Sequence, residues 1–292
     1  MIAAGLLAWY LIPRAPHISY GMDMHRENAI VPESMGYVTG IICLLACIWY
    51  QTHMYDMFVG VCLGMLDDIF VLRWRTKLLL HAIFLIPTVW HLWWWPIALL
   101  CTIFCSNSIN ILSGVNGVEV VQVIVMSMSF MCMDILDGRQ DIFPGLITST
   151  SIALFWFNCY PARIFVGDTF TTYGGCAIAW MTFTRRCYIT TAVMMIPQGV
   201  NFMLSLPQLF GYKHCPRHRL PRWNQSLDML ETSGNGTLLN WILECVGPMH
   251  EARLTILVGL LQTFFASIAL TLYPMGLEDI YLHSSGFPSM PR

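Results

Sequence analysis

Long apolar segments recur along almost the whole chain, and they restrict its possible folds more than any other feature. After a first apolar run of about a dozen residues, nine further segments lie at about 37–50, 54–66, 78–95, 96–112, 118–136, 142–160, 169–184, 188–211 and 253–273. A helix satisfies its own backbone hydrogen bonds, and apolar helices are therefore the usual spans of a lipid bilayer. The sequence predicts an all-α, polytopic membrane protein of about ten transmembrane helices.

Composition supports this prediction and excludes several classes of protein. Of the 292 residues, 56% are hydrophobic and 11% are charged, whereas roughly 25% are charged in an average soluble domain. The formal net charge is −2, which gives no basic field for a nucleic-acid partner. The 11 cysteines show no metal-ligand spacing, and most lie in apolar runs where they act as small buried residues. We expect a single transmembrane domain over residues 1–292.

The first apolar run ends at Pro13 and Arg14, too early to cross about 30 Å of hydrocarbon at 1.5 Å per residue. We interpret it as the remainder of a first spanning helix that is truncated. A lumenal N-terminus would leave eleven of the 15 Lys and Arg residues in cytosolic loops, as the positive-inside rule favours. The predicted cytosolic loops are about 14–35, 67–77, 107–118, 161–168 and 212–252.

Amides and glycines are concentrated in Ser106–Glu119, SNSINILSGVNGVE, directly after an apolar run. Asn107 and Asn110 are three residues apart and share a face of a helix, and Asn116-Gly117 is a turn signal. Amide oxygens can ligate hard cations, and glycine lets a flat ring approach the backbone. Taken alone, the stretch is also compatible with an ordinary helix end and turn.

Carboxylates and cations meet at the ends of other segments. Asp67 and Asp68 end one apolar segment, and the basic stretch that includes Lys77 opens the next. These acids are either a solvated ion-paired cluster or a base and metal site beside phosphate-binding cations. Asp168 is similarly open to two interpretations, as a helix N-cap or as a ligand that completes a Mg²⁺ site.

The densest basic stretch is Cys215–Arg222, CPRHRLPR. A polybasic segment next to a membrane usually meets anionic lipid headgroups. The prolines on both sides of this one indicate a rigid, extended loop, and fixed arginine side chains suit a diphosphate better.

Together these motifs resemble the polyprenyl-phosphate N-acetylhexosamine-1-phosphate transferases. The resemblance runs from about Leu11 to Tyr273. It is carried by Val31–Ser34, Leu66–Asp68, Leu72–Lys77, Asn110–Gly117, Arg163–Asp168, Pro197-Gln198, Asn201-Phe202, Ser205–Gln208, Cys215–Arg222 and Gly247–Glu251. Each motif is weak by itself, but their number and order make the likeness specific.

The resemblance implies a ten-helix transferase of the endoplasmic reticulum membrane with its active site on the cytosolic side. Within the family, the likeness is to the eukaryotic branch that moves GlcNAc-1-phosphate from UDP-GlcNAc to dolichyl phosphate and releases UMP. Besides these substrates and membrane lipid, a homodimer is compatible with the sequence. The alternatives are a relative that uses another lipid or nucleotide sugar, a catalytically impaired relative, and a membrane transporter or scaffold.

By the same likeness, five residues form the reaction centre. Asn110 and Asp168 would hold Mg²⁺, Asp67 and Asp68 would place or deprotonate the acceptor phosphate, and Lys77 would neutralise phosphate charge.

The resemblance also predicts eight substrate-binding residues. Three would line a uracil pocket, three would meet the diphosphate and sugar, one would border the lipid groove, and one lies in the first polar loop. In that order they are Gly114, Asn116 and Phe165; Arg217, His218 and Arg219; Trp74; and Glu33.

Val71 departs from the family, which usually has an asparagine at this place. One helical turn separates it from Asp67, so the missing amide either weakens the metal site or has been made dispensable. We favour the second interpretation, because every other polar residue of the expected site is present. The polar insert after Arg222 is also shorter than in the eukaryotic relatives.

Overall fold

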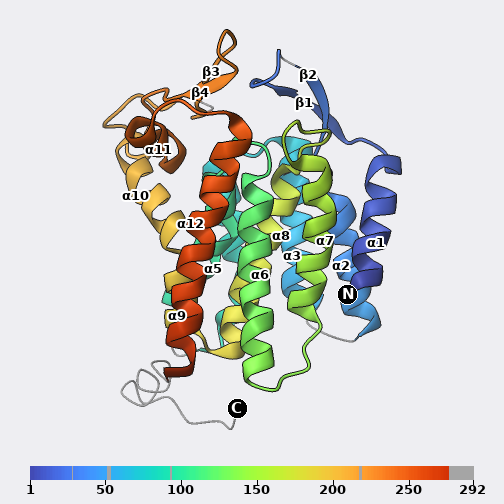
Figure 1. The fold of residues 1–292 in the computed structure, drawn as a ribbon. Coiled ribbons are helices and arrows are strands. Elements are labelled where there is room, and N and C mark those ends of the chain that lie inside the picture. The colour runs from blue at the N-terminus through green and yellow to red at the C-terminus, as the bar shows by residue number, and fades with distance from the viewer. Residues whose placement is uncertain (28, 51–53, 93, 217–218, 276–292) are drawn as a thin grey trace.

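The computed structural model describes residues 1–275 apart from 28, 51–53, 93 and 217–218. In this part of the chain, α-helices form a bundle, and two short β-hairpins lie together with helix α11 at one end of it (Figure 1).

Each predicted apolar segment forms a helix, which confirms that the protein is mostly helical. The segment at 188–211 contains two helices, α9 and α10, and α11 lies in the predicted loop at 212–252. The helices are α1 Ile2–Leu11, α2 Gly36–Trp49, α3 Met54–Phe70, α4 Trp74–Val89, α5 Trp95–Ile111, α6 Val118–Leu136, α7 Phe143–Asn158, α8 Gly167–Arg185, α9 Tyr188–Met194, α10 Ile196–Leu209, α11 Leu238–Val246 and α12 Glu251–Leu272.

The two hairpins were missed by the all-α prediction. Strands β1 (Ser19–Asp23) and β2 (Ala29–Glu33) pair antiparallel, as do β3 (Arg222–Asn224) and β4 (Met229–Glu231). Both hairpins fall in predicted polar loops. Backbone groups outside the helices still need hydrogen-bond partners, and strand pairing supplies them here.

The number of membrane spans is only partly resolved by helix length. Among the described residues, α6 and the helical stretch Glu251–Met275 are long and apolar enough to cross a membrane, and α9 with α10 would form a third, broken span. Several other apolar helices are shorter, with 10–17 residues. The structure therefore supports a membrane protein, whereas the count of ten spans is not confirmed.

Glycines bring three helices into backbone contact near the polar end of the bundle. A Cβ atom added at Gly64 of α3 would lie 2.4 Å from the Cα atom of Thr169 in α8, and one added at Gly175 of α8 would lie 2.1 Å from the carbonyl oxygen of Cys105 in α5. Small residues permit such close packing between apolar helices. As a result, α8 is held directly against both α3 and α5.

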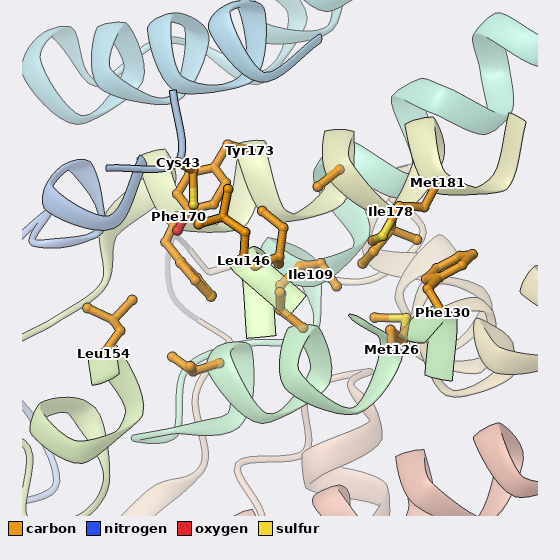
Figure 2. Close-up of a cluster of buried hydrophobic side chains, with 14 of the residues drawn as sticks. Cys43, Ile109, Met126, Phe130, Leu146, Leu154, Phe170, Tyr173, Ile178 and Met181 are labelled. Carbon is orange, nitrogen blue, oxygen red and sulfur yellow. The ribbon is translucent and has the colours of Figure 1, made fainter. Parts of the chain in front are cut away.

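The main hydrophobic cluster extends along α8 from Phe170 to Met181. Figure 2 shows side chains of α2, α5, α6, α7 and α8 meeting there, among them Cys43, Ile109 and Phe170. The fully buried Tyr173 packs edge to face on Phe170 and its hydroxyl group lies 2.7 Å from that of Thr39. This packing fixes both the rotation of α8 about its axis and its position along that axis.

Helices α9 and α10 are bent by 62° at Met195, and buried amides support the break. The side chain of Gln262 in α12 donates to the carbonyl oxygen of Met194 at 2.8 Å. Gln198 in α10 donates to Gln262 at 2.7 Å and to Gln122 of α6 at 2.8 Å. A backbone carbonyl freed by a bend in apolar surroundings is thus hydrogen bonded.

The close approach at Gly64 leads to a stability prediction. We expect Gly64→Ala to lower the free energy of unfolding by about 1–3 kcal/mol, because α3 and α8 must separate to admit the methyl group. Gly199→Ala in α10 is the matched control, since nothing lies within 4 Å of a Cβ atom there, and it should be neutral or stabilising. Thermal unfolding of both variants in detergent tests this; equal melting temperatures would contradict the tight α3–α8 contact.

Candidate functional site

The ammonium group of Lys77 joins three helices at the polar end of the bundle. Its Nζ atom in α4 lies 2.5 Å from Oδ2 of Asp67 in α3 and 3.0 Å from Oδ1 of Asp168 in α8. The side chains of Lys77 and Asp67 are only 13% and 6% exposed, so solvent screens these charges weakly. The predicted base, cation and metal ligand therefore form one ion-pair network, buried at Asp67 and Lys77 and partly exposed at Asp168, whose side chain is 31% exposed.

Asn110 adds a fourth helix, α5, to this network. Its side-chain amide hydrogen bonds to Oδ1 of Asp168, the same oxygen that faces Lys77. The N-cap position of α8 is occupied by Val166, and Asp168 lies within the first turn. The N-cap interpretation of Asp168 was therefore wrong, and its carboxylate is directed at Lys77 and Asn110 instead.

Asp68 has a different role from its neighbour Asp67, because it holds the start of α8. Its Oδ1 atom accepts from the backbone N–H of Asp168 at 2.7 Å, and its Oδ2 atom accepts from the N–H and hydroxyl groups of Thr169 at 3.0 and 2.5 Å. A carboxylate at a helix N-terminus satisfies free N–H groups and interacts favourably with the helix dipole.

Gly167 makes that approach possible. Its φ of 73° lies in the left-handed region, and a Cβ atom there would stand 2.7 Å from Oδ2 of Asp68 and 2.5 Å from the Cα atom of Ser34. Thr169 and Gly167 are site residues that the sequence interpretation missed. The only signal for them was their position on either side of Asp168.

Strand β2 and the residues after it border the same site. The carbonyl oxygen of Pro32 accepts from the N–H of Phe165 at 2.7 Å, and the N–H of Gly36 donates to Val166 at 2.9 Å. Burial raises the pKa of the Glu33 carboxyl group, the negative charge of Asp68 adds to the rise, and a hydrogen bond from Ser19 opposes it. Glu33 thus belongs to the electrostatic surroundings of the acidic network.

Phe165 and Asn116, two of the predicted nucleotide-binding residues, both lie beneath strand β1. A Cβ atom at Gly21 would be 2.8 Å from the ring of Phe165, and the Asn116 amide donates to Asp23 at 3.3 Å. Asn116 is buried and also donates its backbone N–H to Glu251 at 2.7 Å. The hairpin β1–β2 therefore covers both residues.

Asn158 supports this loop from the end of α7, and sequence reasoning overlooked it. Its side chain accepts from the N–H of Gly117 at 3.0 Å and donates to the carbonyl oxygen of Ile164 at 2.9 Å. A buried amide at the end of an apolar helix was the available signal. It links the loop before α6 to the loop before α8.

The basic stretch is described only in part, because Arg217 and His218 lie outside the described residues. Burial lowers the pKa of the Arg219 guanidinium group, and its backbone carbonyl accepts from Asn240 at 3.2 Å. The next residue, Leu220, approaches Gly114 so closely that a Cβ atom at this glycine would lie 2.1 Å from Leu220 Cδ2. The basic stretch therefore reaches the loop that carries Gly114.

A large apolar cavity of about 1140 Å³ lies along α5, α8, α9 and α10. No charged residue of the described part of the chain lines it, and Phe104 and Cys105 line it one to two turns before Asn110 on the same helix. Trp74, which was predicted to border a lipid groove, is 64% exposed at the start of α4 and does not line this cavity.

Comparison with known proteins gives matches over most of the chain. Residues 52–185 match the family model of glycosyl transferase family 4. A Dictyostelium discoideum protein named UDP-N-acetylglucosamine–dolichyl-phosphate N-acetylglucosaminephosphotransferase is 28% identical over 89% of this chain and 84% of its own length. Proteins of the same name are 39% identical in Leishmania amazonensis and 35% identical in Saccharomyces cerevisiae, over 54% and 65% of this chain. These matches confirm the resemblance seen in the motifs.

The coverage of these relatives differs. The aligned regions span 40% of the Leishmania protein and 48% of the Saccharomyces protein, so the chain covers about half the length of these two relatives.

Val71 lies just beyond the end of α3 rather than on its inner face. Its φ of 48° is left-handed and its side chain is 68% exposed. A β-branched residue is strained in this conformation, which asparagine adopts more easily. The asparagine usual in the family therefore suits the backbone at this position, whatever contact its amide makes.

We expect Val71→Asn to raise the free energy of unfolding by about 1 kcal/mol, because the left-handed conformation costs roughly 1–2 kcal/mol for an ordinary residue. Phe70→Asn is the control, since it changes an exposed side chain that α3 still includes. Thermal unfolding gives the comparison. A tenfold rise in enzymatic rate with a lower Mg²⁺ requirement, without stabilisation, would instead indicate an impaired metal site.

Proposed function

We infer that the chain belongs to glycosyl transferase family 4 and transfers N-acetylglucosamine-1-phosphate from UDP-N-acetylglucosamine to dolichyl phosphate, releasing UMP. The names of the relatives support this reaction. The observation that carries the proposal is the buried network in which Lys77 lies between Asp67 and Asp168, with Asn110 beside the latter. Phosphoryl transfer depends on such positioned charges more than on covalent chemistry.

The donor atoms of Asn110 and Asp168 fit Mg²⁺. This ion prefers oxygen ligands and commonly takes only one or two carboxylates from the protein. Rotation of the Asn110 amide would present its oxygen where its nitrogen now faces Asp168. Among the described residues, the three carboxylates of Asp67, Asp68 and Asp168 are accompanied by the ammonium group of Lys77, which leaves negative charge for a cation to neutralise. When bound, Mg²⁺ would stabilise negative charge on the donor diphosphate.

Asp67 and Asp68 have different proposed roles in the reaction. Both oxygens of Asp68 are hydrogen bonded to the start of α8, so we assign it a positioning role. Both oxygens of Asp67 are bonded as well, Oδ2 to Lys77 at 2.5 Å and Oδ1 to the backbone N–H of Leu72 at 2.9 Å. Because the ammonium group of Lys77 can also bind phosphate, we assign Asp67 the role of accepting a proton from, or orienting, the acceptor phosphate. An oxygen of that phosphate attacks the phosphorus bonded to the sugar, and the bond from this phosphorus to the oxygen of UMP breaks.

The nucleotide would lie beneath the hairpin β1–β2. Phe165 offers an aromatic face and Asn116 an amide for uracil. The side chain of Leu220 occupies the space beside Gly114, so we keep this glycine as a pocket residue on the strength of the motif alone. The Arg219 guanidinium group has a buried NH1 atom without a hydrogen-bond partner in the described part of the chain, which makes it a donor available for the diphosphate or sugar. We keep Arg217, His218 and Glu33 as substrate-binding residues on the strength of the motif alone.

The apolar cavity along α5 would receive the polyprenyl chain of the acceptor. The described residues that line it are uncharged, and α5 leads from Phe104 directly to Asn110. A lipid lying there would present its phosphate toward the acidic network. This location differs from the one predicted through Trp74, whose indole is 64% exposed at the start of α4.

We further propose that the site faces the cytosol from the endoplasmic reticulum membrane. Both hairpins and α11 lie at one end of the bundle (Figure 1). The two loops that contain them hold six of the 15 Lys and Arg residues, and the predicted cytosolic side holds eleven. The positive-inside rule assigns such an end to the cytosol. A homodimer stays a prediction from the sequence.

Removal of one proposed metal ligand should abolish the reaction. We expect Asp168→Asn and Asn110→Ala each to reduce UMP release from UDP-GlcNAc on the order of 100-fold or more, because several kcal/mol of transition-state stabilisation are lost. UMP release by purified protein is measured with and without dolichyl phosphate and Mg²⁺.

Asp56→Asn is the matched control, because it makes the same change at the opposite end of α3, and it should keep its activity. Near-normal UMP release by Asp168→Asn would refute the proposed metal site. A folded wild-type chain that releases no UMP under any of these conditions would favour a transporter, a scaffold or an impaired relative.

The proposed orientation has its own test. Asn224-Gln-Ser226 and Asn235-Gly-Thr237 match the glycosylation sequon, and a cytosolic location leaves both unmodified. We expect no mass shift after glycosidase treatment of the protein from eukaryotic membranes. A shift that disappears in Asn235→Gln or Asn224→Gln would show that this end of the bundle is lumenal.

A further inference from the structure

Three potential metal ligands meet beneath the first hairpin, in a cluster separate from the Lys77 network. Asp23 ends β1, His25 lies in the turn that follows, and Glu251 is the first residue of α12. Their exposed fractions are only 2%, 5% and 3%, and one ligand atom from each lies within 4.8 Å of the others.

Two polar atoms of this cluster have no hydrogen-bond partner among the described residues, namely Oε2 of Glu251 and Nε2 of His25. Oε2 of Glu251 instead faces Nδ1 of His25 at 3.4 Å. A buried, unsatisfied carboxylate oxygen is costly unless a cation is close to it. A metal ion bound between these residues would supply that cation.

Further hydrogen bonds hold the two carboxylates of the cluster in place. Oε1 of Glu251 accepts from the backbone N–H of Asn116 at 2.7 Å. Asp23 accepts from the N–H of His25 at 3.0 Å and from the Asn116 amide at 3.3 Å. Metal ligands are commonly oriented by such outer hydrogen bonds.

We propose that Asp23, His25 and Glu251 bind Zn²⁺. One imidazole and two carboxylates are a donor set that Zn²⁺ accepts, whereas Mg²⁺ prefers oxygen ligands alone. Ligands at about 2.1 Å in tetrahedral geometry lie roughly 3.4 Å apart, and the His25–Glu251 separation is 3.4 Å. A fourth position is left for water.

The proposed ion would join parts of the chain that are distant in sequence. It would link the hairpin β1–β2 to the start of α12. Because both carboxylates accept hydrogen bonds from Asn116, the ion would also help to position this residue. This site goes beyond the proposed function, because its ligands and its metal differ from those of the reaction centre.

The test is metal binding by the purified full-length chain in detergent, exposed to Zn²⁺ and then dialysed against excess Mg²⁺. We expect about one Zn²⁺ per chain by mass spectrometry of the metal content, as one three-residue site implies. Co²⁺ in its place should give the absorption bands of a tetrahedral ion. In His25→Asn the Zn²⁺ affinity should fall roughly 100-fold or more, since loss of even an outer partner costs about 10- to 100-fold.

His17→Asn is the matched control, because His17 is exposed in the loop before β1, and it should bind Zn²⁺ as the wild type does. Glu251→Gln provides a second variant that keeps the size and an amide oxygen, in case His25→Asn does not fold. Asp168→Asn should retain Zn²⁺, which separates this site from the reaction centre. Absence of Zn²⁺ from the wild type, or equal affinity in His25→Asn and Glu251→Gln, would overturn the proposal in favour of a plain His25–Glu251 ion pair.

Discussion

The arrangement of the polar end depends on one ammonium group placed between two carboxylates. Lys77 comes from α4 and reaches Asp67 of α3 and Asp168 of α8. Removing three charged groups from water is costly, and mutual attraction compensates only when their geometry is held firmly. The backbone contact at Gly64 supplies that firmness, because it holds α3 against α8 one helical turn before the carboxylates. The geometry of these ion pairs therefore depends on the packing of α3 against α8.

The hairpin β1–β2 completes the surroundings of the proposed nucleotide pocket. Its first strand covers Phe165 and bonds to Asn116, and its second strand is hydrogen bonded to Phe165 through Pro32. The hairpin therefore contacts both the loop before α6 and the loop before α8. Asn158 also joins the same two loops through its hydrogen bonds to Gly117 and Ile164, so each loop is held by both the hairpin and α7.

Much of the candidate site could be predicted from sequence because its residues stand at the ends of apolar segments. Asp67, Asn110 and Asp168 are conspicuous there, and a helical bundle of this kind brings such ends together. The separate role of Asp68 could not be predicted, since its partners Asp168 and Thr169 are 100 and 101 residues away. The hairpins were missed because their short strands lie in polar loops without a clear alternation of apolar residues. Val71 was expected to lie one helical turn after Asp67 on the same helix, because the local sequence gives no sign that α3 ends at Phe70.

The bend between α9 and α10 has a consequence for the synthesis of the chain. The carbonyl oxygen of Met194 is hydrogen bonded by Gln262, which belongs to α12 and is therefore synthesised after α9 and α10. Until α12 has entered the bilayer, this carbonyl and the side chain of Gln198 lack a partner that they have in the finished protein. An unsatisfied backbone group in hydrocarbon costs several kcal/mol. The broken helix pair therefore acquires its full set of hydrogen bonds only once α12 has packed beside it.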